Sequence, residues 1–274
     1  MGSKPRKKIG LALSGGVARG PVHVGVLSVL EREGIPIDYL AGTSAGSIVG
    51  AAYCAGISIA DLRRLSIETG WRKLTMFTLS KHGLLTFSRI EKLLEELTLP
   101  NLNIEDLAIP YTAVTTDLAK GEHVFFRKGP LAQAVQASCS VPGFIKPVKI
   151  DGRFYCDGGV SDNLPVDAVR EMGADYVIGV DLFVPIYYKW LGFLGAGFAA
   201  IETLVRQSGG GYKDADCLII PDISGHNYLD FSESKSEQYM RAGEAAAEAA
   251  LPAIKAALAD ETIPHEAPAL PVLN

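Results

Sequence analysis

The sequence predicts an α/β fold with three layers (α/β/α), in which helices cover both faces of a mostly parallel central sheet. Short apolar runs that end at glycines alternate along the chain with segments of helical periodicity. This alternation is the pattern of strands joined by crossover helices. Hydrophobic residues make up 48% of the 274 residues and no internal repeat divides them, so we expect one large core.

The first half of the chain predicts strands and helices in turn. Apolar residues 9–13 stop at Ser14-Gly15-Gly16, as a buried strand does before a turn. Residues 22–30 place apolar side chains on one helical face, and Gly34 ends that helix. The further elements expected here are a strand at 37–41 and helices at 45–55, 62–67 and 91–97.

The second half continues this pattern and adds two hairpins. Lys120-Gly121 and Asp151-Gly152 are turn dipeptides between strand-like runs. The last Ala- and Glu-rich segment is typical of a long helix, with a break or kink near Pro252. The expected elements are strands at 110–115, 122–126, 144–150, 153–156, 176–181 and 217–220, and helices at 131–137, 165–172 and 234–258.

Residues 8–260 are expected to form a single domain between two unlike ends. Residues 1–7 are basic and flexible, and are either solvated or in contact with anionic lipid headgroups. Residues 261–274 form a Pro-rich tail. The basic start lacks a following apolar h-region, and the longest apolar stretch, 191–201, is shorter than the roughly 20 residues that span a membrane. We expect a cytoplasmic protein, with peripheral contact to a membrane as an open alternative.

Charge and cysteine usage narrow the classes of partner. The net charge of -5 argues against a nucleic-acid partner, because proteins that bind nucleic acid present a strongly basic face. The four cysteines lie far apart, without the Cys-x-x-Cys or Cys/His spacing of a zinc site, and no calcium-loop pattern occurs. We therefore expect small buried cysteines, no metal and no cofactor. The oligomeric state is not predicted.

The pentapeptide Gly42-Thr43-Ser44-Ala45-Gly46 lies between a predicted strand and a predicted helix. This is the context of a nucleophile elbow, in which glycines allow the sharp turn that presents a serine at a helix N-terminus. Alone, the pentapeptide also fits an ordinary N-cap by Ser44, since serine is a favoured cap. The strand before it and the helix after it favour the nucleophile.

A glycine-rich loop, Gly15-Gly16-Val17-Ala18-Arg19-Gly20, also joins a strand to a helix. Its N–H groups and the helix dipole can hold an anion, as acyl transfer requires for its oxyanion. The competing interpretation is a phosphate-binding loop, but the glycine spacing differs and no Gly-Lys-Ser/Thr follows. For Arg19 three roles are open: locking the loop, meeting a phosphate headgroup, or a structural salt bridge.

The tripeptide Asp157-Gly158-Gly159 places a carboxylate after an apolar pair, at a predicted strand end. Asp157 can take the serine proton directly. An ordinary aspartate with a pKa of about 3.9 is a weak base near pH 7, so Asp157 must lie close to the serine and be well oriented. A plain Asp-Gly turn is the alternative. A serine usually borrows a histidine. His226 would give the Ser, Asp, His order of an α/β-hydrolase, whereas for His23 we expect packing or capping.

Taken together and in this order, the motifs resemble the patatin-like phospholipase family across residues 8–182. The matching segments are 13–20 with 23–27, 42–47, 137–144 with 147–148, and 157–159 with 163–166. The resemblance implies a three-layer fold, Ser44 as nucleophile and Asp157 as base without a histidine. It also implies oxyanion donors at Gly15, Gly16 and Val17. The supporting loop residues are Arg19, Gly20, Gly42, Gly46, Gly158 and Gly159.

One position departs from the family pattern. The family usually has a third glycine where this chain has Val17. A β-branched residue rarely adopts a positive φ. The expectation is therefore that the loop needs no left-handed residue at this position, or that the oxyanion hole is reshaped.

The predicted activity is that of a serine lipid acyl hydrolase, a phospholipase A or esterase acting on lipid or other ester substrates. The aromatic-rich stretch 187–198, which overlaps the apolar region 191–201, is expected to be a lid, an interfacial surface or a buried core helix. Residues 71–87 are a second candidate cap. The rival from another class is a non-catalytic lipid-binding or regulatory protein on the same fold. A phosphate- or nucleotide-binding protein is the more distant rival.

Overall fold

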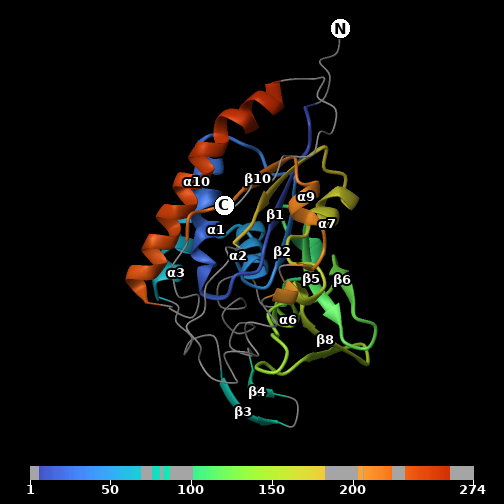
Figure 1. Cartoon of the computed structure of the whole chain (residues 1–274). Helices are drawn as coiled ribbons and strands as arrows, with labels where there is room; N and C mark the ends of the chain where they lie inside the picture. The colour runs from blue at the N-terminus through green and yellow to red at the C-terminus, as the bar shows by residue number, and fades with distance from the viewer. Residues whose placement is uncertain are drawn as a thin grey trace.

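A computed structural model of the chain describes residues 6–68, 76–80, 83–86, 101–182, 203–205, 207–223 and 232–259 (Figure 1). Its main feature is an eight-stranded mixed sheet with the order β10-β9-β1-β2-β5-β8-β7, in which β6 also pairs with β5. Five neighbouring strands are parallel: β10 (Cys217–Ile219), β9 (Tyr176–Val180), β1 (Ile9–Leu13), β2 (Tyr39–Thr43) and β5 (Tyr111–Asp117). The mostly parallel sheet predicted from the sequence is confirmed.

The antiparallel part of the sheet lies beyond β5. It comprises β6 (Glu122–Phe126), β7 (Val148–Ile150) and β8 (Arg153–Asp157). The turn of the β7–β8 hairpin contains Asp151 and Gly152, both at positive φ, as expected of this dipeptide. A separate two-stranded sheet pairs β3 (Met76–Ser80) with β4 (Gly83–Thr86). This hairpin lies within the candidate cap at 71–87.

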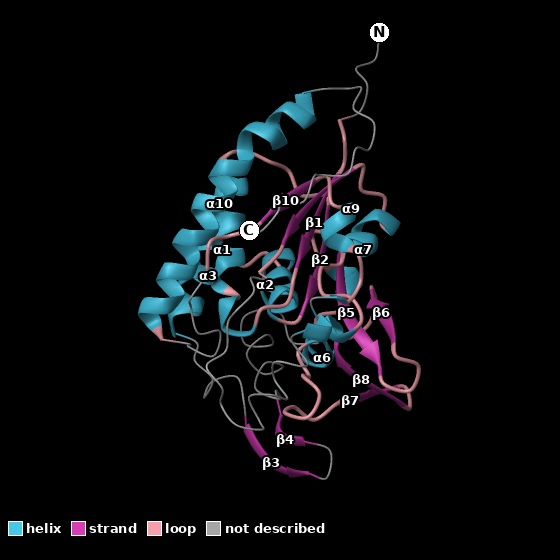
Figure 2. Cartoon of the chain, viewed as in Figure 1, coloured by secondary structure: helices cyan, strands magenta, loops and turns pink. Residues whose placement is uncertain are grey.

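Helices flank the sheet on both sides (Figure 2). One side carries most of them, and their apolar faces join strands β1, β2 and β9 in the larger core. The other side has a smaller, alanine-rich core. The larger group is α1 (Pro21–Arg32), α2 (Ala45–Cys54), α3 (Ile59–Glu68), α6 (Leu131–Ser138) and α10 (Glu233–Ala259), and the smaller is α7 (Val166–Glu171) and α9 (Gly211–Asp214).

Several elements differ from the sequence prediction, and α9, β3 and β4 were not predicted. Strand β2 ends at Thr43 rather than at residue 41, because Gly42 and Thr43 still pair with the neighbouring strands. The strand expected at 144–150 is paired only from Val148 onward. Helix α10 continues through Pro252 to Ala259 instead of breaking there. The predicted helix at 91–97, the stretch 187–201 and the tail 261–274 lie outside the described residues.

All four cysteines are buried and free of disulfides, as the sequence predicts. Within the ranges described above, no helix is both long enough and apolar enough to cross a bilayer.

Candidate active site

Strand β5 brings Ser44 and Asp157 together. The last residue of β2, Thr43, pairs with Val114, and the last residue of β8, Asp157, pairs with Thr115. Strand β6 occupies the opposite edge of β5 at both positions, so β2 and β8 share one edge. Because β2 is parallel and β8 antiparallel to β5, the two strands run toward each other and end at consecutive positions. The residue after β2 is Ser44.

The turn at Ser44 has the strained geometry of a nucleophile elbow. Ser44 has φ 50° and ψ -119°, a region that non-glycine residues avoid and that clusters at functional sites. The flanking glycines are required by close approach. A Cβ on Gly42 would lie 2.4 Å from the Gly46 carbonyl oxygen, and one on Gly46 would lie 2.3 Å from that of Leu13. Ser44 occupies the N-cap position of α2, but its side chain makes no capping hydrogen bond, so capping does not explain the serine.

Asp157 is a buried carboxyl group with one oxygen held and the other open. The Gly159 N–H donates to Oδ1 at 2.8 Å, while Oδ2 is buried and meets no donor at hydrogen-bonding geometry among the described residues. Burial raises the Asp157 pKa from 3.8 to about 6, against the lowering effects of the Ser44 hydroxyl and the Gly159 N–H. A carboxylate with such a pKa is a better base near neutral pH than an ordinary aspartate.

The glycine-rich loop lies directly beside Ser44. A Cβ on Gly15 would be 3.2 Å from the Ser44 Cβ. The Gly15 N–H donates to Asn163 Oδ1 at 3.2 Å, whereas the N–H groups of Gly16 and Val17 have no acceptor within the described part of the chain. Of the three candidate donors, Gly16 and Val17 therefore remain open to an oxyanion.

Val17 adopts φ 54°, although its branched side chain disfavours that region. Of the two alternatives, the one in which the loop needs no left-handed residue at position 17 is wrong, and a reshaped oxyanion hole stays a prediction. The conformation begins the short 3-10 helix η1 (Val17–Arg19). The loop therefore adopts at Val17 a turn that a glycine would adopt without strain, and the valine backbone is strained there.

Buried polar side chains fix this loop. The Arg19 Nη1 donates to the Leu182 carbonyl at 2.6 Å, and Arg19 is 2% exposed, which supports the loop-locking role. The His23 Nε2 donates to the Ser14 carbonyl at 2.8 Å. Burial lowers the His23 pKa to about 4, so His23 is a neutral structural donor at physiological pH. His226 lies outside the described residues.

Two polar residues of the site were not predicted from the sequence. Asn163 accepts from the glycine loop, and the Ser138 Oγ accepts from the Ser44 N–H at 2.9 Å. Both side chains are buried. Their signal was present as small polar residues inside otherwise apolar segments, but their partners lie far away in sequence.

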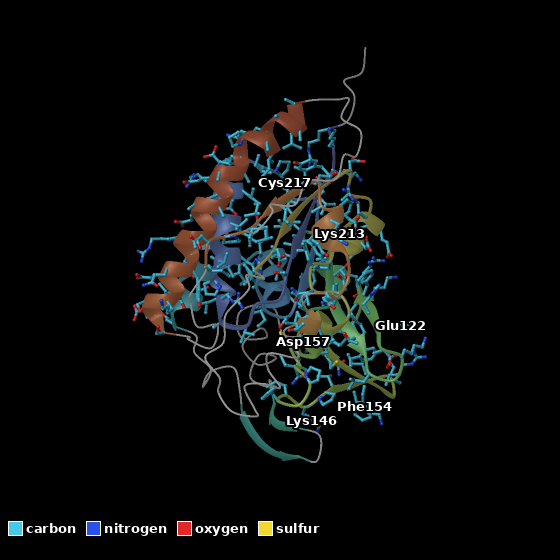
Figure 3. All side chains as sticks on the ribbon, in the orientation of Figure 1. Glu122, Lys146, Phe154, Asp157, Lys213 and Cys217 are labelled. Carbon is cyan, nitrogen blue, oxygen red and sulfur yellow. The ribbon has the colours of Figure 1, made fainter. Side chains whose placement is uncertain are left out.

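The site therefore combines a strained serine, a buried carboxyl group with a raised pKa and two backbone N–H groups without an acceptor among the described residues. Nucleophilic acyl transfer requires these three parts. Figure 3 shows Asp157 near the end of the sheet that lies beside α6. Groups of three or more histidine, cysteine or acidic side chains arranged to hold a metal ion do not occur within the described ranges.

Comparison with known proteins shows which family and which relatives this chain resembles. A family model described as "Patatin-like phospholipase" matches residues 11–170. An uncharacterised NTE family protein of Mycobacterium tuberculosis is 40% identical over 189 residues, which cover 66% of this chain and 50% of that protein. The neuropathy target esterase sws of Drosophila melanogaster is 34% identical over 182 residues, 64% of this chain and 13% of that one.

The fold also matches a solved structure. The crystal structure of VipD from Legionella pneumophila superimposes with a TM-score of 0.63 at 16% identity, over 92% of this chain and 68% of that chain. This chain spans about half the length of the mycobacterial relative.

Proposed function

The chain belongs to the patatin-like phospholipase family, and from that premise we propose that it is a serine lipid acyl hydrolase, with Ser44 as nucleophile and Asp157 as base. The observation that carries the proposal is the meeting of β2 and β8 on one edge of β5, which places a strained serine against a buried carboxylate. A strained serine backbone and a buried carboxyl group both destabilise a fold, and such features cluster at functional sites.

The proposed reaction has two halves. Asp157 accepts the Ser44 proton as Oγ attacks the ester carbonyl, and the N–H groups of Gly16 and Val17 hold the oxyanion. Protonated Asp157 then gives its proton to the leaving alcohol or lysophospholipid. In the second half Asp157 accepts a proton from water, the hydroxide attacks the acyl-enzyme, and the proton returns to Ser44 as the fatty acid leaves.

Lipid esters are the proposed substrates because the family is one of phospholipases. Peripheral contact with a membrane surface belongs to the same proposal, as does residence in the cytoplasm. The proposal extends the catalytic unit over residues 8–260.

Hydrolysis assays test the proposal. Purified wild-type protein is assayed on p-nitrophenyl esters of increasing chain length and on phospholipid vesicles, beside Ser44→Ala, Asp157→Asn and Asp162→Asn. Loss of the nucleophile or base should lower kcat by at least about a thousandfold. Asp162→Asn is the matched control, since Asp162 is also a buried aspartate with a pKa raised to about 6. Full activity in Ser44→Ala or Asp157→Asn contradicts the proposal.

The same experiment separates the rivals. A non-catalytic lipid-binding protein would hydrolyse nothing and would show a higher Tm with lipid. A triad that uses His226 would lose activity in His226→Ala, whereas the Ser44 and Asp157 dyad predicts that this variant keeps it.

A further inference from the structure

One three-residue segment, Ser138–Ser140, holds the backbone of both proposed catalytic residues. The Ser44 N–H donates to the Ser138 Oγ at 2.9 Å, and the Asp157 N–H donates to the Ser140 carbonyl at 2.9 Å. Between them, the Cys139 Sγ donates to the Ser44 carbonyl at 3.3 Å. All three residues are nearly or fully buried. The segment therefore contacts the end of β2 and the end of β8 at once.

The Ser138 hydroxyl supplies an acceptor where the sheet no longer can. Up to Thr43, strand β2 forms its ladder with β5, but at the next position β5 pairs with Asp157 of β8. The Ser44 N–H is thus the first backbone donor after the last residue pair between β2 and β5. A buried N–H without an acceptor is costly, and here it belongs to a residue with a strained backbone.

The direction of the Ser138 side chain is unusual for the end of a helix. A serine near a helix C-terminus commonly bonds the carbonyl four residues earlier, and Ser140 does so, with its Oγ donating to the Gln136 carbonyl at 2.8 Å. Ser138, the last residue of α6, instead directs its hydroxyl oxygen at the elbow. Its contact joins α6 to a position 94 residues earlier in the chain.

We propose that Ser138 is a positioning residue of the esterase, whose hydroxyl fixes the Ser44 backbone so that the nucleophile stays aligned with Asp157 and the oxyanion donors. This inference rests on the proposed function of Ser44 and Asp157. Ser138 acts through the Ser44 backbone and takes no part in proton transfer. Its loss therefore affects the chemical step more than the binding of the ester.

The test compares kcat and KM for Ser138→Ala, Ser138→Thr and the wild-type chain on a p-nitrophenyl ester, with folding checked by circular dichroism. Ser138→Ala should lower kcat about 10- to 100-fold, as small misplacements of reacting groups do, and leave KM within about twofold. Ser138→Thr keeps the hydroxyl and should restore most of kcat. Ser28→Ala is the control, because among the described residues that partly buried hydroxyl bonds only within α1 and to α10.

The outcomes are separable. A folded Ser138→Ala with the kcat of Ser28→Ala overturns the inference and leaves the proposed function intact. Equal loss in Ser138→Ala and a folded Ser138→Thr also overturns it, because volume and not the hydrogen bond would then matter. If Ser138→Ala does not fold, Ser138→Cys decides: a weaker acceptor should lower kcat at least threefold, and an unchanged kcat overturns the inference. A wild-type chain without esterase activity removes the proposed function, and the inference with it.

Discussion

The Asn163 Oδ1 accepts the N–H of Gly15 and thereby links the loop that follows Asp157 to the loop beside Ser44. Asn163 is itself anchored, since its N–H donates to the Ser208 Oγ at 3.2 Å and that hydroxyl donates to the Gly159 carbonyl at 2.7 Å. The acid loop and the glycine loop are thus held in one network. Asn163 contributes a neutral acceptor next to the proposed oxyanion donors.

Replacing this neutral acceptor by a charged one should impair acylation. Asn163→Asp keeps an oxygen for the Gly15 N–H but places a negative charge beside Asp157 and the oxyanion. We expect the rate of labelling by a fluorophosphonate to fall at least about tenfold. The like charge should also raise the Asp157 pKa, so the activity midpoint should move to higher pH. A variant with wild-type rate and midpoint would contradict this role.

The raised pKa of Asp157 predicts the pH dependence of activity. The base must be ionised to accept a proton, so kcat/KM should rise with pH and reach half its maximum near pH 6, where the carboxyl group titrates. Asp162 also has a pKa raised to about 6 by burial, so the profile is repeated with Asp162→Asn. The midpoint near pH 6 should persist in Asp162→Asn. If it disappears in that variant, the midpoint reports the titration of Asp162 and not that of Asp157.

The free energy of unfolding should also depend on the ionisation of Asp157, but it should fall with rising pH where activity rises. The folded Asp157 pKa of about 6 exceeds its ordinary 3.8, so the contribution of this carboxyl group to stability is full below about pH 4 and is lost as the pH rises through about 6. Asp157→Asn avoids burying the charge. It should be more stable than wild type above pH 6, by on the order of 2–3 kcal/mol, and this difference should shrink at pH 4. Urea unfolding at both pH values measures it.

Val17→Gly should remove backbone strain without harming the site. A left-handed conformation destabilises a non-glycine residue by roughly 1–2 kcal/mol, and glycine relieves this strain. Glycine also loses more entropy on folding and removes the contacts of a half-buried side chain, and the relieved strain offsets these two losses. We expect an unchanged or slightly higher free energy of unfolding and retained kcat. Val148→Gly, at a half-buried strand position, is the control and should destabilise the fold. Equal destabilisation of the two variants would count against strain at Val17.

The motif glycines should differ sharply in their tolerance of alanine. A Cβ on Gly46 would press against the Leu13 backbone at 2.3 Å, while one on Gly20 would meet the Ala45 Cβ at 3.4 Å, an ordinary contact. Gly46→Ala should therefore abolish activity or folding, and Gly20→Ala should retain both. Thermal unfolding and ester hydrolysis of the two variants check this. A tolerated Gly46→Ala would contradict the elbow geometry.

Local patterns were enough to predict the strands of the eight-stranded sheet, most helices and the candidate residues Ser44 and Asp157, but not the β3–β4 hairpin. Glycines that end an apolar run are a local signal, and so are the motifs around Gly15, Ser44 and Asp157. The strand order was not predictable in this way, because it is set by contacts between distant segments. Nor was the extension of β2 to Thr43, which depends on pairing with both β1 and β5.

The two supporting residues were missed for the same reason. Ser138 and Asn163 act on partners far away in sequence, 94 residues in the first case and 148 in the second. At Val17 the propensity rule left two alternatives, a relaxed loop or a reshaped oxyanion hole, and the φ of 54° excludes the first. Tertiary constraint overrides local preference at such positions.

The central claim, that Ser44 is a nucleophile activated by Asp157, is tested most directly by locating a covalent adduct. The wild-type chain, Ser44→Ala and Asp157→Asn are treated with a fluorophosphonate, and the modified peptide is identified by mass spectrometry. The account predicts one phosphonyl group on Ser44 in the wild type, none in Ser44→Ala, and labelling slowed by at least about a hundredfold in Asp157→Asn. An adduct on another residue, or equally fast labelling of Asp157→Asn, would contradict it.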